Sequence, residues 1–215
     1  MNNLPRGTRL QLIIAAGEIF ADHGFEGASI RAIAEKAGAN IAAINYHFGS
    51  KKNLYKEAIL YSHQIAGKIS DFLSLEDEGI FRTRKATKEA LRKIIRRDFN
   101  MFFSPEFPAW TGRLILRGLF DSHPIFMEII RDVFIPDYRI LKEFALKANP
   151  RLKEQQAHHW TLSFFGKISL YVFFAEPILM VLDKKKYDPR DIDAAVDYIT
   201  RASFQELYPP TEKKK

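Results

Sequence analysis

Apolar side chains recur at helical spacing along nearly the whole chain, and no segment shows sustained alternation of apolar and polar residues. The pattern therefore predicts an all-α protein. Four shorter helices are expected in the first sixty residues, which brings the total to about nine. Long amphipathic stretches predict the five later helices, at about 84–103, 109–120, 124–148, 152–175 and 189–207.

N-cap residues and glycines set the helix boundaries. Thr8, with Gln11 three residues later, predicts a capping box at the start of the first helix, and Gly24 predicts its end. Asp188 followed by Pro189 marks the start of the last helix. The same signals bound the other early helices: Ser29 and Gly38 the second, Asn40 and Gly49 the third, and Ser50 the start of a fourth that continues past Leu60.

Residues 29–48 form two short predicted helices joined by a tight turn, where Gly38 supplies a backbone conformation that other residues rarely adopt. Ile44 and Phe48 are spaced to face the first helix of the pair. This arrangement is typical of a helix-turn-helix, whose second helix can enter the major groove of DNA. A helical hairpin with no DNA-binding role is the alternative on this pattern alone.

The outward side of the third helix has the chemistry of a DNA-reading surface. Ala42 and Ala43 are small enough to allow close approach to base edges or a thymine methyl group. Asn45, Tyr46 and His47 can donate hydrogen bonds to phosphates or bases. Packing of Tyr46 and His47 on neighbouring helices is the alternative. The expected outward set is Asn40, Ile41, Ala42, Ala43, Asn45, Tyr46 and His47.

Composition narrows the class of protein. The 215 residues are 47% hydrophobic and 27% charged, as in globular proteins, and fit one large domain or a small domain joined to a larger one. With no cysteine, a disulfide scaffold, a thiolate zinc site and a cysteine nucleophile are excluded. No stretch approaches the ~20 apolar residues of a membrane span, and the first residues lack a signal peptide. We expect a cytoplasmic protein.

The net charge of +7 (33 basic minus 26 acidic residues) lies mainly outside the helix-turn-helix. Residues 82–98 carry 8 basic and 2 acidic groups, whereas residues 1–60 carry 7 and 5. The basic face of this segment is most simply a solvated helix surface; contact with DNA or with a partner protein is the alternative. Its members are Lys85, Lys88, Arg92 and Arg96.

Lys51 and Lys52 occupy the first turn of the fourth predicted helix, where the helix dipole disfavours cations by roughly 0.3–1 kcal/mol each. A DNA phosphate at that helix end would make these charges favourable. Arg31, just after the Ser29 cap, has the same character. These charges favour DNA binding over a purely structural role.

Residues 8–60 resemble the N-terminal domain of the TetR family of bacterial transcriptional regulators. The resemblance implies that Ser29 caps the second helix near a phosphate, that Arg31 reaches a base, and that Lys51 grips the backbone. Asn45 departs from the tyrosine common in the family, and Lys52 from an acidic residue. The matching stretches are Gly24-Phe25-Glu26-Gly27-Ala28-Ser29-Ile30-Arg31-Ala32-Ile33-Ala34, Ala37-Gly38-Ala39-Asn40 and Asn45-Tyr46-His47-Phe48-Gly49-Ser50-Lys51.

Residues 99–138 hold nine aromatic side chains in forty positions, with polar groups between them. The family resemblance, together with this composition, favours a pocket for an aromatic or apolar small molecule; filling of a helical core is the alternative. The segment 113–117, with Pro136 and residues 166–177, resembles regulators of antibiotic-sensitivity and efflux genes. The expected pocket residues are Phe99, Phe102, Phe103, Trp110, Arg113, Arg117, Phe120, His123 and Phe126.

The family resemblance also implies a homodimer, in which the helices at 152–175 and 189–207 of each subunit form a four-helix bundle. Burial within one subunit is the alternative for part of each apolar stripe. The expected interface residues are Leu162, Phe165, Ile168, Tyr171, Ile192, Val196 and Ile199.

The sequence thus predicts an all-α protein with a helix-turn-helix domain at 1–58 and a ligand-binding and dimerisation domain at 59–215. We expect a repressor that leaves its double-stranded DNA operator when a small molecule binds, with no cofactor and no metal. No phosphate-binding loop, metalloprotease motif or nucleophile elbow indicates an enzyme. The alternatives are a protein or enzyme of this fold that has lost DNA binding, and an accessory factor acting through residues 82–97.

Overall fold

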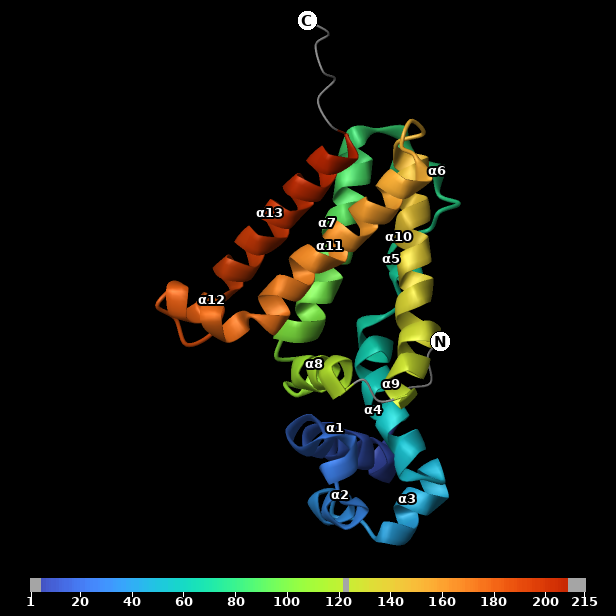
Figure 1. Ribbon diagram of the computed structural model, residues 1–215, viewed down its shortest axis with the longest axis vertical. Helices are drawn as coiled ribbons and strands as arrows, with labels where there is room; N and C mark the ends of the chain where they lie inside the picture. Colours follow the sequence, from blue (N-terminus) through green and yellow to red (C-terminus); the bar gives the residue numbers. More distant parts are fainter. Residues whose placement is uncertain (1–4, 122–123, 209–215) are drawn as a thin grey trace, which may run out of the picture. The chain divides into compact units, whose positions relative to one another are not determined.

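The computed structural model describes residues 5–121 and 124–208. Within these ranges it contains thirteen α-helices, one π-helical segment and no strand (Figure 1), which confirms the predicted all-α class. The predicted total of about nine helices was low, because helices of four to seven residues are too short to show an apolar stripe. The described residues divide into two compact units.

The first unit comprises residues 1–67 and 101–134, as far as they are described. Helix α1 packs against α2, α3, α4 and α8, and α4 packs against α9. Their apolar side chains share one core. The predicted boundary after residue 58 therefore falls inside α4, and Trp110 and Phe126 share the core of the helix-turn-helix. The elements are α1 (Gly7–Gly27), α2 (Ile30–Lys36), α3 (Ile41–Phe48), α4 (Lys51–Ala66), α8 (Thr111–Asp121), α9 (Pro124–Ile129) and η1 (Ile130–Phe134).

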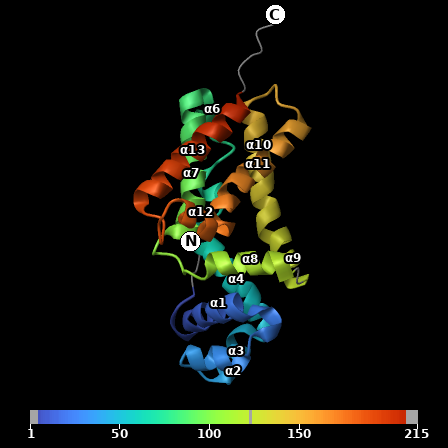
Figure 2. The same cartoon turned by 60° about the vertical axis from the view of Figure 1, so that its left-hand side comes forward.

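The second unit comprises residues 68–100 and 135–215, as far as they are described. Helix α11 packs against α10, α12 and α13, as Figures 1 and 2 show. A buried cluster of Arg97 with Asp98 and Asp137 interrupts its apolar core. The elements are α5 (Ile69–Phe72), α6 (Glu78–Arg82), α7 (Arg84–Phe103, of which 84–100 belong here), α10 (Ile135–Ala148), α11 (Glu154–Phe173), α12 (Ala175–Val181) and α13 (Pro189–Leu207).

Most of the predicted caps are present. The side chains of Ser29, Asn40 and Ser50 accept hydrogen bonds from backbone N–H groups at the starts of α2, α3 and α4. Asp188 forms a capping box with Asp191, and Pro189 opens α13. These local signals are reliable because each cap satisfies N–H groups that the helix itself leaves free.

The capping box predicted for Thr8 and Gln11 is wrong. Helix α1 begins at Gly7, which has a positive φ of 58°, and the cap position is taken by Arg6 without a side-chain hydrogen bond. At the other end Gly24 interrupts the helix with φ 72° and ψ 177°, although a further turn continues to Gly27. Gly24 therefore ends the regular part of α1, as predicted.

Pro136 divides the long helix predicted at 124–148, and Pro177 follows the helix predicted at 152–175. A proline lacks an N–H group, and its ring clashes with the carbonyl four residues earlier. For Pro136 that carbonyl is in Asp132, inside the π-helical turn that separates α9 from α10. For Pro177 it is in Phe173, the last residue of α11.

Within the described residues no single helix is long and apolar enough to span a membrane. Helices α11 and α12 meet the length and hydropathy criteria only when taken together, and a bend of 72° separates them.

The basic face of α7 is largely used inside the second unit. Arg92 pairs with Asp197 at 2.9 Å, and Arg96 pairs with Asp193; both acids lie on α13. Lys85 and Lys88 are exposed. The acidic partners are about 100 positions away in the sequence, so the charge pattern of residues 82–98 could not show them.

Candidate nucleic-acid interface and ligand pocket

Helices α2 and α3 form the predicted helix-turn-helix. Gly38 adopts a φ of +61° in the turn, and the Ala39 N–H donates to the Ala34 carbonyl at 2.9 Å. Ile44 and Phe48 are buried in the core of the first unit, as their spacing predicts. One side of α3 is therefore fixed by packing, and the other side is turned outward.

The outward side of α3 carries the predicted DNA-reading residues. Tyr46 is 85% exposed, and its ring meets the His47 ring edge-on with centroids 4.9 Å apart. The alternative in which Tyr46 packs on a neighbouring helix therefore does not hold. Ala43 and His47 are partly covered. The exposed members of the predicted set, on α3 and near it, are Ser29, Arg31, Asn40, Ile41, Ala42, Asn45, Tyr46 and Lys52.

Lys51 is held by the end of α1. Its Nζ donates to the Glu26 carbonyl at 3.3 Å and lies 4.8 Å above the Phe25 ring. Carbonyl oxygens at a helix C-terminus carry partial negative charge, so this contact offsets part of the penalty that Lys51 meets at the start of α4. The ammonium group is thereby held against the end of α1.

Lys52 and Lys56 have acidic partners that the sequence does not reveal. Lys52 pairs with Glu128 of α9 at 2.9 Å, and Lys56 pairs with Asp132 of η1 at 3.0 Å. The hydrogen bond from Lys52 lowers the pKa of Glu128 below its ordinary value, so this carboxylate is ionised at neutral pH. Each pair joins residues 76 positions apart in the sequence.

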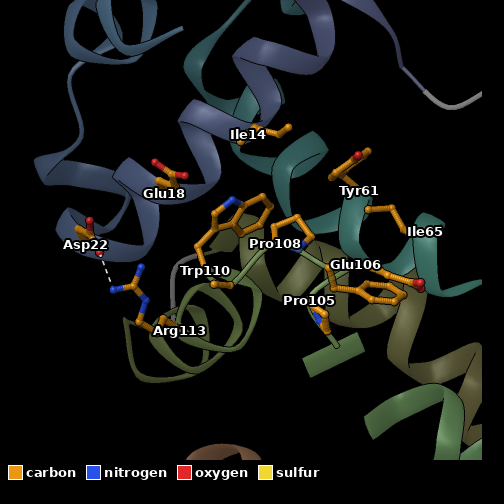
Figure 3. Close-up of a pocket in the computed structure, with 12 residues that line it drawn as sticks. Ile14, Glu18, Asp22, Tyr61, Ile65, Pro105, Glu106, Pro108, Trp110 and Arg113 are labelled. Carbon is orange, nitrogen blue, oxygen red and sulfur yellow. Dashed lines mark ion pairs between the residues drawn. The ribbon is translucent and has the colours of Figure 1, made fainter. Parts of the chain in front are cut away.

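A pocket of about 370 Å³ lies in the first unit between α1, α4 and residues 105–113 (Figure 3). Trp110 forms part of its wall, and its indole lies against Gly17 of α1. Arg113 pairs with Asp22 at 3.1 Å on the wall formed by α1. The lining residues are Ile14, Glu18, Asp22, Tyr61, Ile65, Pro105, Glu106, Phe107, Pro108, Ala109, Trp110 and Arg113.

Two of the nine predicted pocket residues, Trp110 and Arg113, line this pocket. Phe126 is buried in the core against Gly118, and Phe120 is 79% exposed. Phe99 is buried in the second unit, and His123 lies outside the described residues. Sequence reasoning missed the lining residues from α1 and α4, because aromatic density marks only one of the segments that form the pocket. The half-buried members are Phe102, Phe103 and Arg117.

Arg117 ties α8 to the end of α1. Its guanidinium donates to the Asp22 carbonyl at 2.9 Å and pairs with Asp121 at 3.5 Å. Gly24 leaves room for this pair, since a Cβ there would lie 2.9 Å from Arg117 Nε. Burial and the nearby Asp121 raise the pKa of Tyr55 to about 12, so its hydroxyl stays protonated beside this cluster.

The predicted interface residues differ in exposure. Leu162 is 45% exposed, while Phe165, Tyr171 and Ile192 are partly covered. The same face of α11 carries Leu170, which is 51% exposed and belongs to the same apolar stripe. The remaining three are buried in the core of the second unit because α11 packs on α10 and α13: Ile168, Val196 and Ile199.

No group of three His, Asp or Glu side chains in residues 5–121 and 124–208 is arranged to hold a metal ion. His158 contacts Tyr138, and its ring meets that of His159 edge-on. The described site is thus a set of hydrogen-bond donors on α3 and α4 together with a pocket in the same unit.

Comparison with protein families gives two matches. Residues 12–58 match the model of bacterial regulatory proteins of the tetR family. Residues 87–207, more than half of the chain, match the C-terminal domain of the HTH-type transcriptional dual regulator CecR. The two matches cover the helix-turn-helix and most of the second unit.

Three curated relatives regulate transcription in different directions. The chain is 44% identical over 124 residues to the activator FasR of Mycolicibacterium smegmatis, covering 57% of this chain and 52% of that protein. It is 38% identical over 87 residues to the dual regulator CecR of Shigella flexneri (40% and 39% covered). It is 41% identical over 51 residues to the repressor AcnR of Corynebacterium glutamicum (24% and 27% covered). The chain thus spans about half the length of these relatives or less.

The fold also resembles a solved structure, the TetR family transcriptional regulator PfmR from Thermus thermophilus. The TM-score is 0.64 at 18% identity, and the match covers 95% of this chain and 97% of that one. The helix-turn-helix, the C-terminal match and the fold agree: the chain belongs to the TetR family of DNA-binding transcriptional regulators, a non-enzymatic family, with a C-terminal domain of the CecR type.

Proposed function

We propose that the protein is a homodimeric repressor that binds an operator through α3 and leaves it when a small molecule binds. The outward face of α3 carries the DNA-binding part of this proposal, because a tyrosine 85% exposed on a short helix has no packing role. Relatives that repress, activate or do both exist. Repression is the simplest mode, since DNA binding alone can block transcription.

The proposed DNA contacts follow from the geometry of the site. Residues 40–47 would lie in a major groove, with Ser29, Arg31, Lys51 and Lys52 near phosphates. Two subunits would bind half-sites about one helical turn, ~34–36 Å, apart. The operator and the regulator would meet in the bacterial cytoplasm.

The proposed dimer uses the exposed side of α11. Leu162 and Leu170 are two turns apart on that side, and Gly166 lies between them with open space where a side chain would be. Exposed leucines on one face favour contact with a second copy. The buried residues Ile168, Val196 and Ile199 would then support the interface from beneath.

The proposed effector site is the pocket lined by Trp110 and Arg113. Its volume lies within the ~300–1,000 Å³ range of small-molecule sites, and it combines apolar walls with a few charged groups. It is formed by α1, which begins the helix-turn-helix unit. A ligand there could change DNA affinity only as far as it prefers one conformation of this unit.

Genomic fragments bound by the purified protein, followed by gel shifts at several salt concentrations, test the proposal. We expect specific fragments and a steep negative slope of log affinity against log salt, because phosphate contacts release counterions. Absence of DNA binding at low salt would favour a protein of the same fold that has lost this function. Activation of the adjacent gene would contradict the repressor part alone.

A further inference from the structure

We propose that the pocket between α1, α4 and residues 105–113 binds a small organic cation with an aromatic or alkyl body. This inference rests on the proposed function of that pocket as the effector site, and it names the chemical class of the ligand. It follows from the charge and the aromatic surface of the walls.

The charged residues of the lining favour a cation. Glu18, Asp22 and Glu106 contribute three carboxylates, against the single guanidinium of Arg113. Arg113 is already paired with Asp22 at 3.1 Å, and Lys36, from outside the lining, pairs with Glu18 at 2.6 Å. Glu106 has no ion pair with any residue in the part of the chain that the structure describes.

The acidic side chains of the lining lie on two sides of the pocket. Figure 3 shows Glu18 and Asp22 on α1 and Glu106 on the segment that faces α4. Trp110 lies between these two groups. Since Lys36 and Arg113 already pair with the two acids of α1, the carboxylate of Glu106 is the group that would attract a cation.

The uncharged lining suits an organic cation better than a hydrated metal ion. Tyr61 and Phe107 offer aromatic rings, whose faces attract ammonium groups by roughly 0.5–2 kcal/mol per contact. Ile14 and Ile65 add aliphatic surface for the body of the ligand. A small metal ion would leave this apolar surface unused.

Anionic and neutral ligands fit the pocket less well. An anion would meet one guanidinium that Asp22 already neutralises, and the unpaired carboxylate of Glu106 would repel it. A neutral apolar molecule would fill the volume but would gain no attraction from the carboxylate of Glu106. The walls therefore discriminate by charge as well as by size.

Titration of the full-length protein with benzyltrimethylammonium, followed by calorimetry and tryptophan fluorescence, tests this inference. We expect saturable binding, at least tenfold tighter than that of the neutral isostere neopentylbenzene or the anion phenylacetate. Similar affinity for all three probes, or no binding of the cation, would overturn the inference.

Two variants locate the site. Glu106→Gln removes the exposed carboxylate and should weaken cation binding several-fold, whereas Glu89→Gln, on the exposed face of α7, should leave it unchanged. Tyr61→Leu keeps apolar volume but removes a ring, so it should weaken the cation more than neopentylbenzene. Wild-type affinity for the cation in both pocket variants would overturn the assignment to this pocket.

The same protein sample separates this inference from the proposed function. DNA binding without any ligand is measured first by gel shift. Cation binding by a protein that does not bind DNA supports the pocket assignment and contradicts the regulator. DNA binding by a protein that does not bind the cation contradicts only the ligand class proposed here.

Discussion

The indole of Trp110 lies directly against the backbone of Gly17, where α1 meets the wall of the pocket. A Cβ atom on Gly17 would lie 2.4 Å from both Cε2 and Cζ2 of Trp110. Glycine inside a helix costs about 0.5–1 kcal/mol relative to alanine. Gly17 loses this helix stability, but its lack of a side chain makes room for a buried aromatic contact between α1 and the start of α8.

Gly17→Ala should therefore destabilise the protein. The added methyl group displaces Trp110 or bends α1, and overpacking of this kind costs about 1–3 kcal/mol, which exceeds the gain in helix propensity. Urea unfolding measures the difference. Gly27→Ala is the matched control, because its Cβ would meet only His23 Cβ at an ordinary 3.5 Å; equal midpoints for the two variants would contradict the argument.

Local signals in the sequence predicted most of the helix boundaries. Ser29, Asn40, Ser50 and Asp188 each cap the helix expected of them, because a cap depends on residues within one turn. Boundaries set by other forces were missed. Pro136 divides the predicted helix at 124–148, although the apolar stripe runs through it.

The candidate site could be predicted only where one segment forms it. The α3 surface is a single helix, so its outward residues follow from spacing alone. The pocket needs α1, α4 and residues 105–113 together, and the pairing of Lys52 with Glu128 joins residues 76 positions apart. Tertiary packing decides such contacts, and residue spacing along the chain carries no signal of them.

Tyr46→Ala should weaken operator binding without changing the stability of the fold. Its side chain is almost fully exposed, so the loss is that of a hydrogen bond to DNA, about 0.5–1.5 kcal/mol or a few-fold to tenfold in affinity. Gel shifts and thermal melts on the same samples measure both quantities. Unchanged DNA affinity would remove Tyr46 from the interface.

Lys51→Ala should lower the salt dependence of DNA binding by about one unit of slope, as expected for one lost phosphate contact. Lys85→Ala is the matched control, since Lys85 is an exposed lysine on the basic face of α7. If Lys85→Ala lowers the slope of log affinity against log salt as much as Lys51→Ala does, the basic segment 82–98 contacts DNA as well.

Glu128→Gln should tighten DNA binding. The carboxylate holds Lys52 at 2.9 Å and lies beside the proposed phosphate contact, so its removal leaves the lysine charge to the DNA. A steeper salt slope should accompany the higher affinity. Asp132→Asn, which releases Lys56 further along α4, should have a smaller effect; weaker binding by Glu128→Gln would show that the pair positions Lys52 instead.

The same pair has a predictable pH dependence. Lys52 lowers the folded-state pKa of Glu128, so the contribution of the pair to stability is present above the ordinary glutamate pKa of about 4.5. It is lost as the pH falls through the lowered value. Unfolding of wild type and Glu128→Gln should therefore converge in acid, and a difference that persists well below pH 4 would contradict this origin.

Leu170→Glu should convert the dimer to a monomer. Leu170 is 51% exposed on α11, and a carboxylate there would be buried without a partner in the proposed interface. Met127→Glu is the matched control, because Met127 is 53% exposed but lies in the first unit. Light scattering after size exclusion should show half the mass only for Leu170→Glu. Since two half-sites must be bound together, the monomer should also lose operator affinity. A dimer that withstands Leu170→Glu would place the interface on a different face.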